Sequence, residues 1–281
     1  MKKPKFGMSS CGFQELSEEN FKDLGEAGVR EIEISLCFDK YPFFDYKLIK
    51  KRADEYGIDL WSFHLPFRPF ETNNIASLEK DVRNNTVAMH TEYIKKASDI
   101  GIRNFVIHPS AEPNRDEDRA EMIEYASEAL AFLSDTAQKE GGVIAVENLP
   151  RTCLGRDSGE IKKLISKNDD LRVCFDTNHL LTEPAKDFIK DIGEKIITTH
   201  FSDYDFKDEK HWLPGEGNIN WRELTEELEK AGYEGPILYE VRLLPPENGS
   251  IKRRPLTFFD FKKNYDCLIN KRQPEAIGVP L

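Results

Sequence analysis

The segment Val143–Glu147 reads Val-Ile-Ala-Val-Glu, a short apolar run that ends in a carboxylate. A second apolar run, Arg172–Asp176, ends in the same way after an intervening amphipathic stretch. Apolar runs of about four to eight residues with little polar alternation are typical of parallel strands covered on both faces. This strand–helix–strand unit therefore predicts an α/β fold.

The same alternation continues outward to both ends of the chain. The expected strands are Lys5–Ser9, Glu31–Leu36, Leu60–Leu65, Phe105–Pro109, Val143–Leu149, Arg172–Thr177, Ile196–Ser202 and Ile237–Val241. Because helical stretches separate them without an internal linker, we predict a single (β/α)₈ TIM barrel over residues 1–281, with the active site at the C-terminal mouth of the strands. A doubly wound sheet is the alternative, but no glycine-rich phosphate loop follows the first strand.

Capping signals delimit several of the expected helices. Ser17 is a suitable N-cap before Glu18 and Glu19, and Gly101 and Gly141 are suitable ends for two long helices. We expect further caps at Ser158 and Asn220, helices over Leu78–Ile100, Asp116–Glu140 and Asp260–Asn270, a long loop over Pro245–Pro255, and a loosely packed tail after Asn270.

Composition narrows the function classes. The chain has 40 Lys+Arg against 51 Asp+Glu, a net charge of −11 that disfavours a nucleic-acid partner. We expect its densest basic run, Lys252–Arg254, to be a solvated loop. The five cysteines include no C-x-x-C pair, and the sequence has neither a signal core nor an apolar run of the ~20 residues needed to cross a bilayer. We therefore expect a cytoplasmic protein without a membrane partner.

Most of the six histidines follow expected strands. His90 is the exception, since it falls inside a helical stretch. The C-terminal ends of barrel strands converge on one mouth, where active sites form. The histidines expected at that mouth are His64, His108, His179, His200 and His211.

Carboxylates also occur at the C-terminal ends of the expected strands. Glu147, Asp176 and Glu240 each end an apolar strand, and a buried carboxylate is costly unless it is paired or binds a metal. Together with His200 they form a ligand set that suits one divalent cation, Mn²⁺, Co²⁺, Mg²⁺ or Zn²⁺. Pairing with Arg or Lys at the mouth is the alternative. We expect Glu33 to line the pocket wall or to form an ion pair.

An ordered series of motifs resembles the xylose isomerase-like TIM-barrel superfamily, which includes sugar phosphate isomerases and epimerases, inosose dehydratases and the endonuclease IV (AP endonuclease family 2) group. The motifs are His64-Leu-Pro-Phe, Val-Ile-His108-Pro, Val-Glu147-Asn, Phe-Asp176-Thr-Asn-His179, His200-Phe-Ser-Asp203, Pro214-Gly-Glu-Gly-Asn-Ile-Asn-Trp221 and Tyr-Glu240. The resemblance implies that Glu147, Asp176, His200 and Glu240 bind the metal, that both glutamates move protons, and that His179 contacts substrate.

The chain departs from the family pattern in two places. Ketose epimerases carry a sugar-binding Arg shortly after the histidine of the seventh strand, whereas Phe201–Lys207 contains none. His64, His108 and Glu209-Lys-His211 resemble the additional ligands of the trinuclear endonuclease IV site, but Glu209 stands where that site has Asp. We therefore expect one ion.

The leading functional hypothesis is a metal-dependent isomerase or epimerase acting on a sugar, sugar phosphate or polyol. Glu147 and Glu240 would act as acid and base on opposite faces of the substrate, and the cation would stabilise an enediolate. A dehydratase or lyase acting on an inosose or keto-sugar would use the same site. Two further hypotheses are an endonuclease IV-type phosphodiesterase and a non-catalytic sugar-binding module.

The remaining expectations concern the substrate pocket. A small carbohydrate is the expected partner, and the oligomeric state stays open between a monomer and a homo-oligomer. Aromatic surfaces against which a sugar could rest are offered by Trp61, Phe67, Phe70, Tyr204 and Trp212. The residues expected to contact the substrate are His64, His108, His179, His211 and Arg242.

Overall fold

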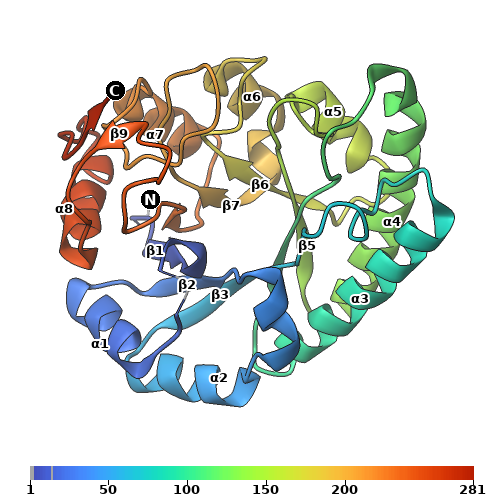
Figure 1. The fold of residues 1–281 in the computed structure, drawn as a ribbon, viewed down its shortest axis with the longest axis horizontal. Coiled ribbons are helices and arrows are strands. Elements are labelled where there is room, and N and C mark those ends of the chain that lie inside the picture. The colour runs from blue at the N-terminus through green and yellow to red at the C-terminus, as the bar shows by residue number, and fades with distance from the viewer. Residues whose placement is uncertain (1–2, 14) are drawn as a thin grey trace.

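The computed structural model describes residues 3–13 and 15–281, and within them eight parallel strands form one barrel (Figure 1). The strands are β1 (Phe6–Ser9), β2 (Glu31–Ile34), β3 (Asp59–His64), β4 (Asn104–Ile107), β5 (Val143–Glu147), β6 (Arg172–Asp176), β7 (Ile196–His200) and β8 (Ile237–Tyr239). Each one lies within a residue or two of its predicted bounds.

The strands are paired in a single continuous order, β7-β6-β5-β4-β3-β2-β1-β8. The ring closes between β7 and β8, where Phe201 and Tyr239 form a parallel bridge. Two backbone hydrogen bonds support the closure: Phe201 N–H donates to Leu238 O at 2.8 Å, and Glu240 N–H donates to Phe201 O at 3.2 Å. The predicted barrel is confirmed, and the doubly wound alternative is excluded.

Helices surround the strands as an outer ring (Figure 1). They are α1 (Glu18–Ala27), α2 (Tyr46–Glu55), α3 (Lys80–Ser98), α4 (Arg119–Lys139), α5 (Ser158–Leu164), α6 (Ala185–Ile192), α7 (Trp221–Lys230) and α8 (Phe258–Leu268), with short 3₁₀ turns η1 (Ser10–Gly12), η2 (Phe38–Phe43), η3 (Asp116–Asp118) and η4 (Gly193–Lys195). Within the described chain, no helix combines the length and apolar character needed to cross a membrane.

Capping explains where these helices begin. Ser17 and Asn220 cap α1 and α7 as predicted, each accepting a hydrogen bond from the N3 backbone N–H. The prediction for α5 was wrong by one residue, because Asp157 rather than Ser158 accepts the Glu160 N–H.

The last helix, α8, begins earlier than the sequence predicted. Thr257 and Asp260 form a reciprocal capping box there, which satisfies the free N–H groups of the first turn. Asp260 is consequently the third residue of the helix and not its first.

The C-terminal tail is anchored, which corrects the expectation of loose packing. Gln273 accepts a hydrogen bond from Trp221 N–H and donates one to Ile219 O. Further along, β10 (Val279–Pro280) pairs antiparallel with β9 (Ile251–Lys252) inside the stretch predicted to be only a loop. The tail therefore covers the segment between β8 and α8.

The alternation of side chains along each strand places the functional residues at the mouth of the barrel. A small apolar cluster fills the barrel interior and consists of Val106, Ala145 and Cys174. Because alternate residues of a strand share a face, the residues two positions later also point toward the barrel axis. Those residues are His108, Glu147 and Asp176, one level nearer the C-terminal mouth.

Candidate metal centre and substrate pocket

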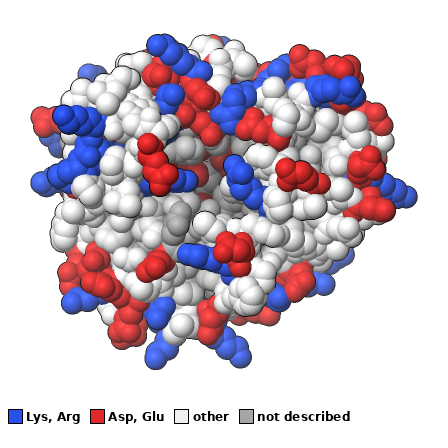
Figure 2. Space-filling view, in the orientation of Figure 1, with Lys and Arg blue, Asp and Glu red and all other residues white. Residues whose placement is uncertain are grey.

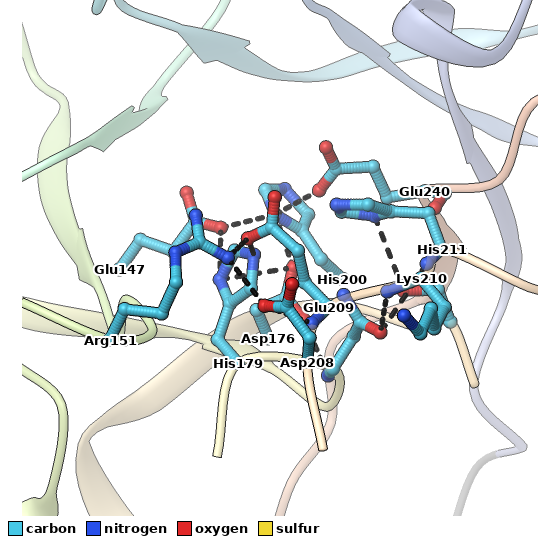
Figure 3. A network of polar contacts seen from close by, with 12 residues as sticks. Glu147, Arg151, Asp176, His179, His200, Asp208, Glu209, Lys210, His211 and Glu240 are labelled. Carbon is cyan, nitrogen blue, oxygen red and sulfur yellow. Dashed lines mark hydrogen bonds and ion pairs between the residues drawn. The ribbon is translucent and has the colours of Figure 1, made fainter. Parts of the chain in front are cut away.

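Four side chains from separate strand ends meet at the floor of the mouth (Figure 3). Glu147, Asp176, His200 and Glu240 each offer one ligand atom, and these atoms lie within 4.8 Å of one another. The Nδ1 atom of His200 is 3.0 Å from Glu147 Oε1, 2.7 Å from Glu240 Oε2 and 3.8 Å from Asp176 Oδ2. The structure thus brings the complete predicted ligand set together.

One carboxylate oxygen at this centre, Asp176 Oδ2, is buried without a hydrogen-bond partner among the described residues, whereas Glu240 Oε2 lies 2.7 Å from His200 Nδ1. Burial, followed by the negative charges of Glu240 and Glu147, raises the pKa of Asp176 well above its usual value. No Arg or Lys forms an ion pair with these three carboxylates in the described chain. An unsatisfied buried carboxylate oxygen among two further carboxylates and an imidazole fits a divalent cation, and the Arg/Lys pairing alternative fails.

The protonation of the centre is coupled through His200. Burial opposes ionisation of Glu147, but the charges of His200 and His108 outweigh it and hold the pKa of Glu147 well below its usual range. Burial likewise opposes a charged His200, yet Cys174 and the neighbouring carboxylates raise the pKa of that imidazole well above normal. The carboxylates and the imidazole of this centre therefore stabilise each other's charged forms against the cost of burial.

Glu33 holds His200 from the opposite side. The His200 Nε2 atom lies 3.0 Å from Glu33 Oε1, and Ser9 and Ser62 donate hydrogen bonds to the same carboxylate at 3.0 and 2.9 Å. Because the Glu33 carboxylate accepts the hydrogen bond from Nε2 of His200, the Nδ1 atom of the ring is directed at the three carboxylates of the centre. Of the two roles left open by the sequence, Glu33 has that of an ion-pair partner.

Two predicted substrate contacts also touch Glu147. The Nε2 atoms of His64 and His108 each lie 3.2 Å from Glu147 Oε2. Burial opposes protonation of His64, but the hydrogen bond and charge of Glu147 prevail and raise its pKa. Burial prevails at His108 and lowers its pKa. These contacts fix the carboxylate orientation, which the sequence did not predict.

A third group lies beside the centre. His179, Glu209 and His211 bring ligand-type atoms within 4.8 Å of one another. The His179 Nδ1 atom is 2.9 Å from Asn148 O, and its Nε2 atom is 3.6 Å from Glu209 Oε2. Burial lowers the pKa of His179. The five predicted histidines thus surround one mouth, whereas His90 is buried in α3 as predicted.

Asp203, just past β7, holds the loop that carries Glu209 and His211. Its buried carboxylate accepts hydrogen bonds from Trp221 Nε1 at 2.8 Å and from the backbone N–H groups of Tyr204, Gly215 and Ile219. This role was not predicted from the sequence. The sequence did offer one signal for it, because Asp203 belongs to the family-like motif His200-Phe-Ser-Asp203.

The pocket above the centre has a volume of about 340 Å³, within the range of small-molecule sites. Of the aromatic residues predicted to line it, Phe67 and Phe70 do so, and Arg242 also contributes to its lining. The others pack elsewhere, because each satisfies a structural hydrogen bond: Trp61 with Thr198, Tyr204 with Leu180 O and Trp212 with Ser250.

The basic run predicted to be solvated is exposed at Lys252 and Arg254, but the prediction was wrong for Arg253. Arg253 is buried and its guanidinium lies 2.7 Å from Glu216, while Arg254 lies 2.7 Å from Asp260. Folding of the tail over this segment buries Arg253, a long-range effect that a local charge pattern does not encode. The run therefore offers no basic stripe to nucleic acid.

The chain is similar to known proteins in both sequence and structure. It is 29% identical to protein MJ1311 of Methanocaldococcus jannaschii over 203 residues, 69% of this chain and 68% of that protein. It is 33% identical to fructoselysine 3-epimerase of Escherichia coli O157:H7 over 63 residues, 22% of this chain and 23% of that protein. A crystal structure of a D-tagatose 3-epimerase-like protein superposes with a TM-score of 0.74 at 27% identity, covering 85% of this chain and 90% of the other.

A family model described as xylose isomerase-like TIM barrel matches residues 21–254. That match spans β2 to β9 and includes every residue of the metal centre. The chain belongs to the xylose isomerase-like TIM-barrel family.

Proposed function

We propose that this protein is a metal-dependent sugar isomerase or epimerase. The observation that carries the proposal is the convergence of Glu147 and Glu240, two potential proton carriers, on one centre with Asp176 and His200. That centre forms the floor of a pocket of small-molecule size. The similarity to proteins named as sugar 3-epimerases supports the same class.

Glu147, Asp176, His200 and Glu240 would hold one divalent cation of the Mn²⁺, Co²⁺, Mg²⁺ or Zn²⁺ class. When bound, such a cation supplies Lewis-acid stabilisation of negative charge that develops on the substrate oxygens. Glu33 keeps Nδ1 of His200 directed at the centre. The orphaned Oδ2 atom of Asp176 is the strongest sign that the protein alone does not complete this site.

The two glutamates would transfer the proton at the carbon beside the carbonyl. One carboxylate removes that proton, an enediolate forms, and the other glutamate returns a proton to the opposite face in an epimerisation. Their surroundings differ: the Glu147 side chain is 1% exposed and held by histidines, whereas that of Glu240 is 20% exposed. We propose that His64, His108, His179, His211 and Arg242 contact the substrate.

The expected compartment is the cytoplasm, and free thiols support it. All five cysteines are unpaired, including the pocket residues Cys11 and Cys37. Thiols without disulfides are typical of reducing compartments.

The test is proton exchange on candidate ketoses and inososes in D₂O with Mn²⁺, followed by NMR. We expect deuterium at one carbon beside the carbonyl, together with an isomer or epimer. Glu147→Gln and Glu240→Gln should each abolish exchange, whereas Glu227→Gln, a change on the outer helix α7 where Glu227 pairs with Lys230, should not. Exchange with loss of water would instead indicate a dehydratase, and the absence of exchange on every compound would refute the proposal.

Metal content tests the number of ions. We expect close to one ion per chain in protein purified without chelator, because Glu147, Asp176, His200 and Glu240 form the one candidate group of four ligands among the described residues, whereas His64–His108–Glu147 and His179–Glu209–His211 are groups of three with a single carboxylate each. Three zinc ions per chain would refute the one-ion proposal and favour a phosphodiesterase.

A further inference from the structure

The mouth of the pocket has two halves that differ in charge. Loops that follow β4, β5 and β7 contribute Glu112, Arg151 and Glu209 to its lining. The Arg151 guanidinium is paired there with Glu112, Asp208 and Glu209 at N–O distances of 2.5, 2.8 and 3.2 Å. Figure 3 shows Arg151 beside Asp208 and Glu209. This half of the mouth is acidic, and its arginine is already neutralised.

The other half is built by segments that follow β8, β1, β2 and β3. Apart from Glu240 at the metal centre, the described lining of this half contains no carboxylate. Its wall between the two ends is uncharged and includes Cys11, Ser35, Leu36, Cys37, Phe38 and Tyr41. Arg242 stands at one end of this wall and Arg68 at the other. Figure 2 shows basic side chains on both sides of the central hollow.

These two arginines differ from Arg151 in having no acidic partner. Neither guanidinium forms an ion pair with any carboxylate of the described chain, and both side chains are exposed. The Arg68 guanidinium lies over the ring of Phe70, 4.4 Å from its centroid, and 5.9 Å from that of Phe67. Stacking of this kind limits the orientations of the planar group while leaving its N–H donors free.

We propose that the substrate carries a carboxylate or phosphate at the end remote from its reacting carbons, that Arg68 binds this group, and that Arg242, at the other end of the wall, adds to the positive charge of this half. The inference rests on the proposed function, since the reacting carbons must lie at the metal centre. Guanidinium groups bind both oxyanions through paired, charge-assisted hydrogen bonds. The uncharged wall accommodates the carbon chain between the two ends.

The charge of the whole chain makes local arginines necessary for such a ligand. A net charge of −11 repels an anion at long range, and the acidic half of the mouth repels it at short range. The anionic end is therefore directed to the β8–β3 half. A neutral sugar could accept hydrogen bonds from these arginines through its hydroxyls, but it would gain no ion-pair attraction from them.

The experiment compares three ketohexoses that differ only at carbon 6: D-fructose, D-fructuronate and D-fructose 6-phosphate. Their binding is measured by calorimetry in Mn²⁺-containing buffer, and their proton exchange by NMR in D₂O. At least one anionic sugar should bind roughly tenfold or more tightly than fructose, and whether it is the uronate or the phosphate identifies the group. Arg68→Gln and Arg242→Gln should each reduce that ratio several-fold. The control Arg222→Gln, on exposed α7 and paired with Glu226, should preserve it.

Salt dependence of the unmodified protein supplies a measurement free of folding effects. Raising NaCl from about 50 to about 500 mM should lower the ratio of the affinity for the anionic sugar to the affinity for D-fructose. Equal binding of all three sugars, or an advantage that survives the double arginine variant, would overturn the inference. Turnover of neutral fructose alone refutes the inference and leaves the proposed function intact. Arginine-dependent anion binding without proton exchange on any sugar would support the inference and refute the proposed function.

Discussion

Replacing Glu33 by glutamine tests whether the contact between β2 and β7 prepares the metal centre. The Glu33 carboxylate accepts from Ser9, Ser62 and Nε2 of His200 at 2.9–3.1 Å, and all four residues are buried. Glutamine has nearly the same volume, but only one of its two terminal atoms accepts hydrogen bonds. If its amide nitrogen faces His200, the ring proton must move to Nδ1, which removes the lone pair that a cation needs. If its carbonyl faces His200, the bond persists without charge assistance.

Partners that orient a ligating histidine contribute about 10- to 100-fold to metal affinity. We therefore expect Glu33→Gln to weaken Mn²⁺ binding by that factor, about 1.4–2.7 kcal/mol, in calorimetric titrations near neutral pH. The matched control is Glu31→Gln, two residues earlier on the same strand. Glu31 is equally buried and pairs with Lys5, away from the centre. This variant should lower stability while preserving Mn²⁺ affinity.

Comparing the Mn²⁺ affinities of Glu33→Gln and Glu31→Gln separates the orientation of His200 from general destabilisation. Unchanged Mn²⁺ affinity in Glu33→Gln, with a normal melting temperature, would show that Nδ1 of His200 needs no partner at Nε2. Equal loss of affinity in both variants would show that general destabilisation, and not imidazole orientation, controls the site.

Three further predictions concern a ligand of the centre and its neighbour His179, the buried His90, and the buried pair Arg253–Glu216. Asp176→Asn should remove most metal affinity because it deletes a charge at the centre, whereas His179→Ala should mainly reduce turnover; loss of metal as complete in His179→Ala would make His179 a ligand. Burial lowers the pKa of His90 from 6.5 to about 4, so the unfolded chain takes up a proton first and stability falls as the pH drops below about 6.5. The free energy of unfolding, measured with urea, should therefore fall between pH 7 and pH 5 by about 2 kcal/mol less in His90→Gln than in the unmodified protein. An identical pH dependence of the two proteins would contradict this. Arg253→Met should cost about 3–5 kcal/mol by leaving Glu216 buried and unpaired; adding Glu216→Gln should recover part of that loss in thermal unfolding, and a purely additive double variant would disprove the pairing argument.

The sequence by itself determined the barrel and the floor of its mouth. Strands such as Val143–Glu147 were predictable because an apolar run without polar alternation has few other stable environments than a covered parallel sheet. Glu147 and Asp176 were predictable as neighbours because each ends such a strand and parallel strands end at the same edge. These are local patterns combined with one rule of topology.

Only the tertiary structure decided which polar groups meet. Glu33 and His200 are 167 positions apart, and their contact depends on the closure of the ring and on side-chain rotamers. Arg151 and Arg242 both follow strands and looked alike in the sequence, yet only Arg151 lies beside three carboxylates. Charge–charge contacts act through space and at short range, so a linear pattern shows that ionisable groups gather at the mouth but not how they pair. For the same reason, it left open which of them stay free for a ligand.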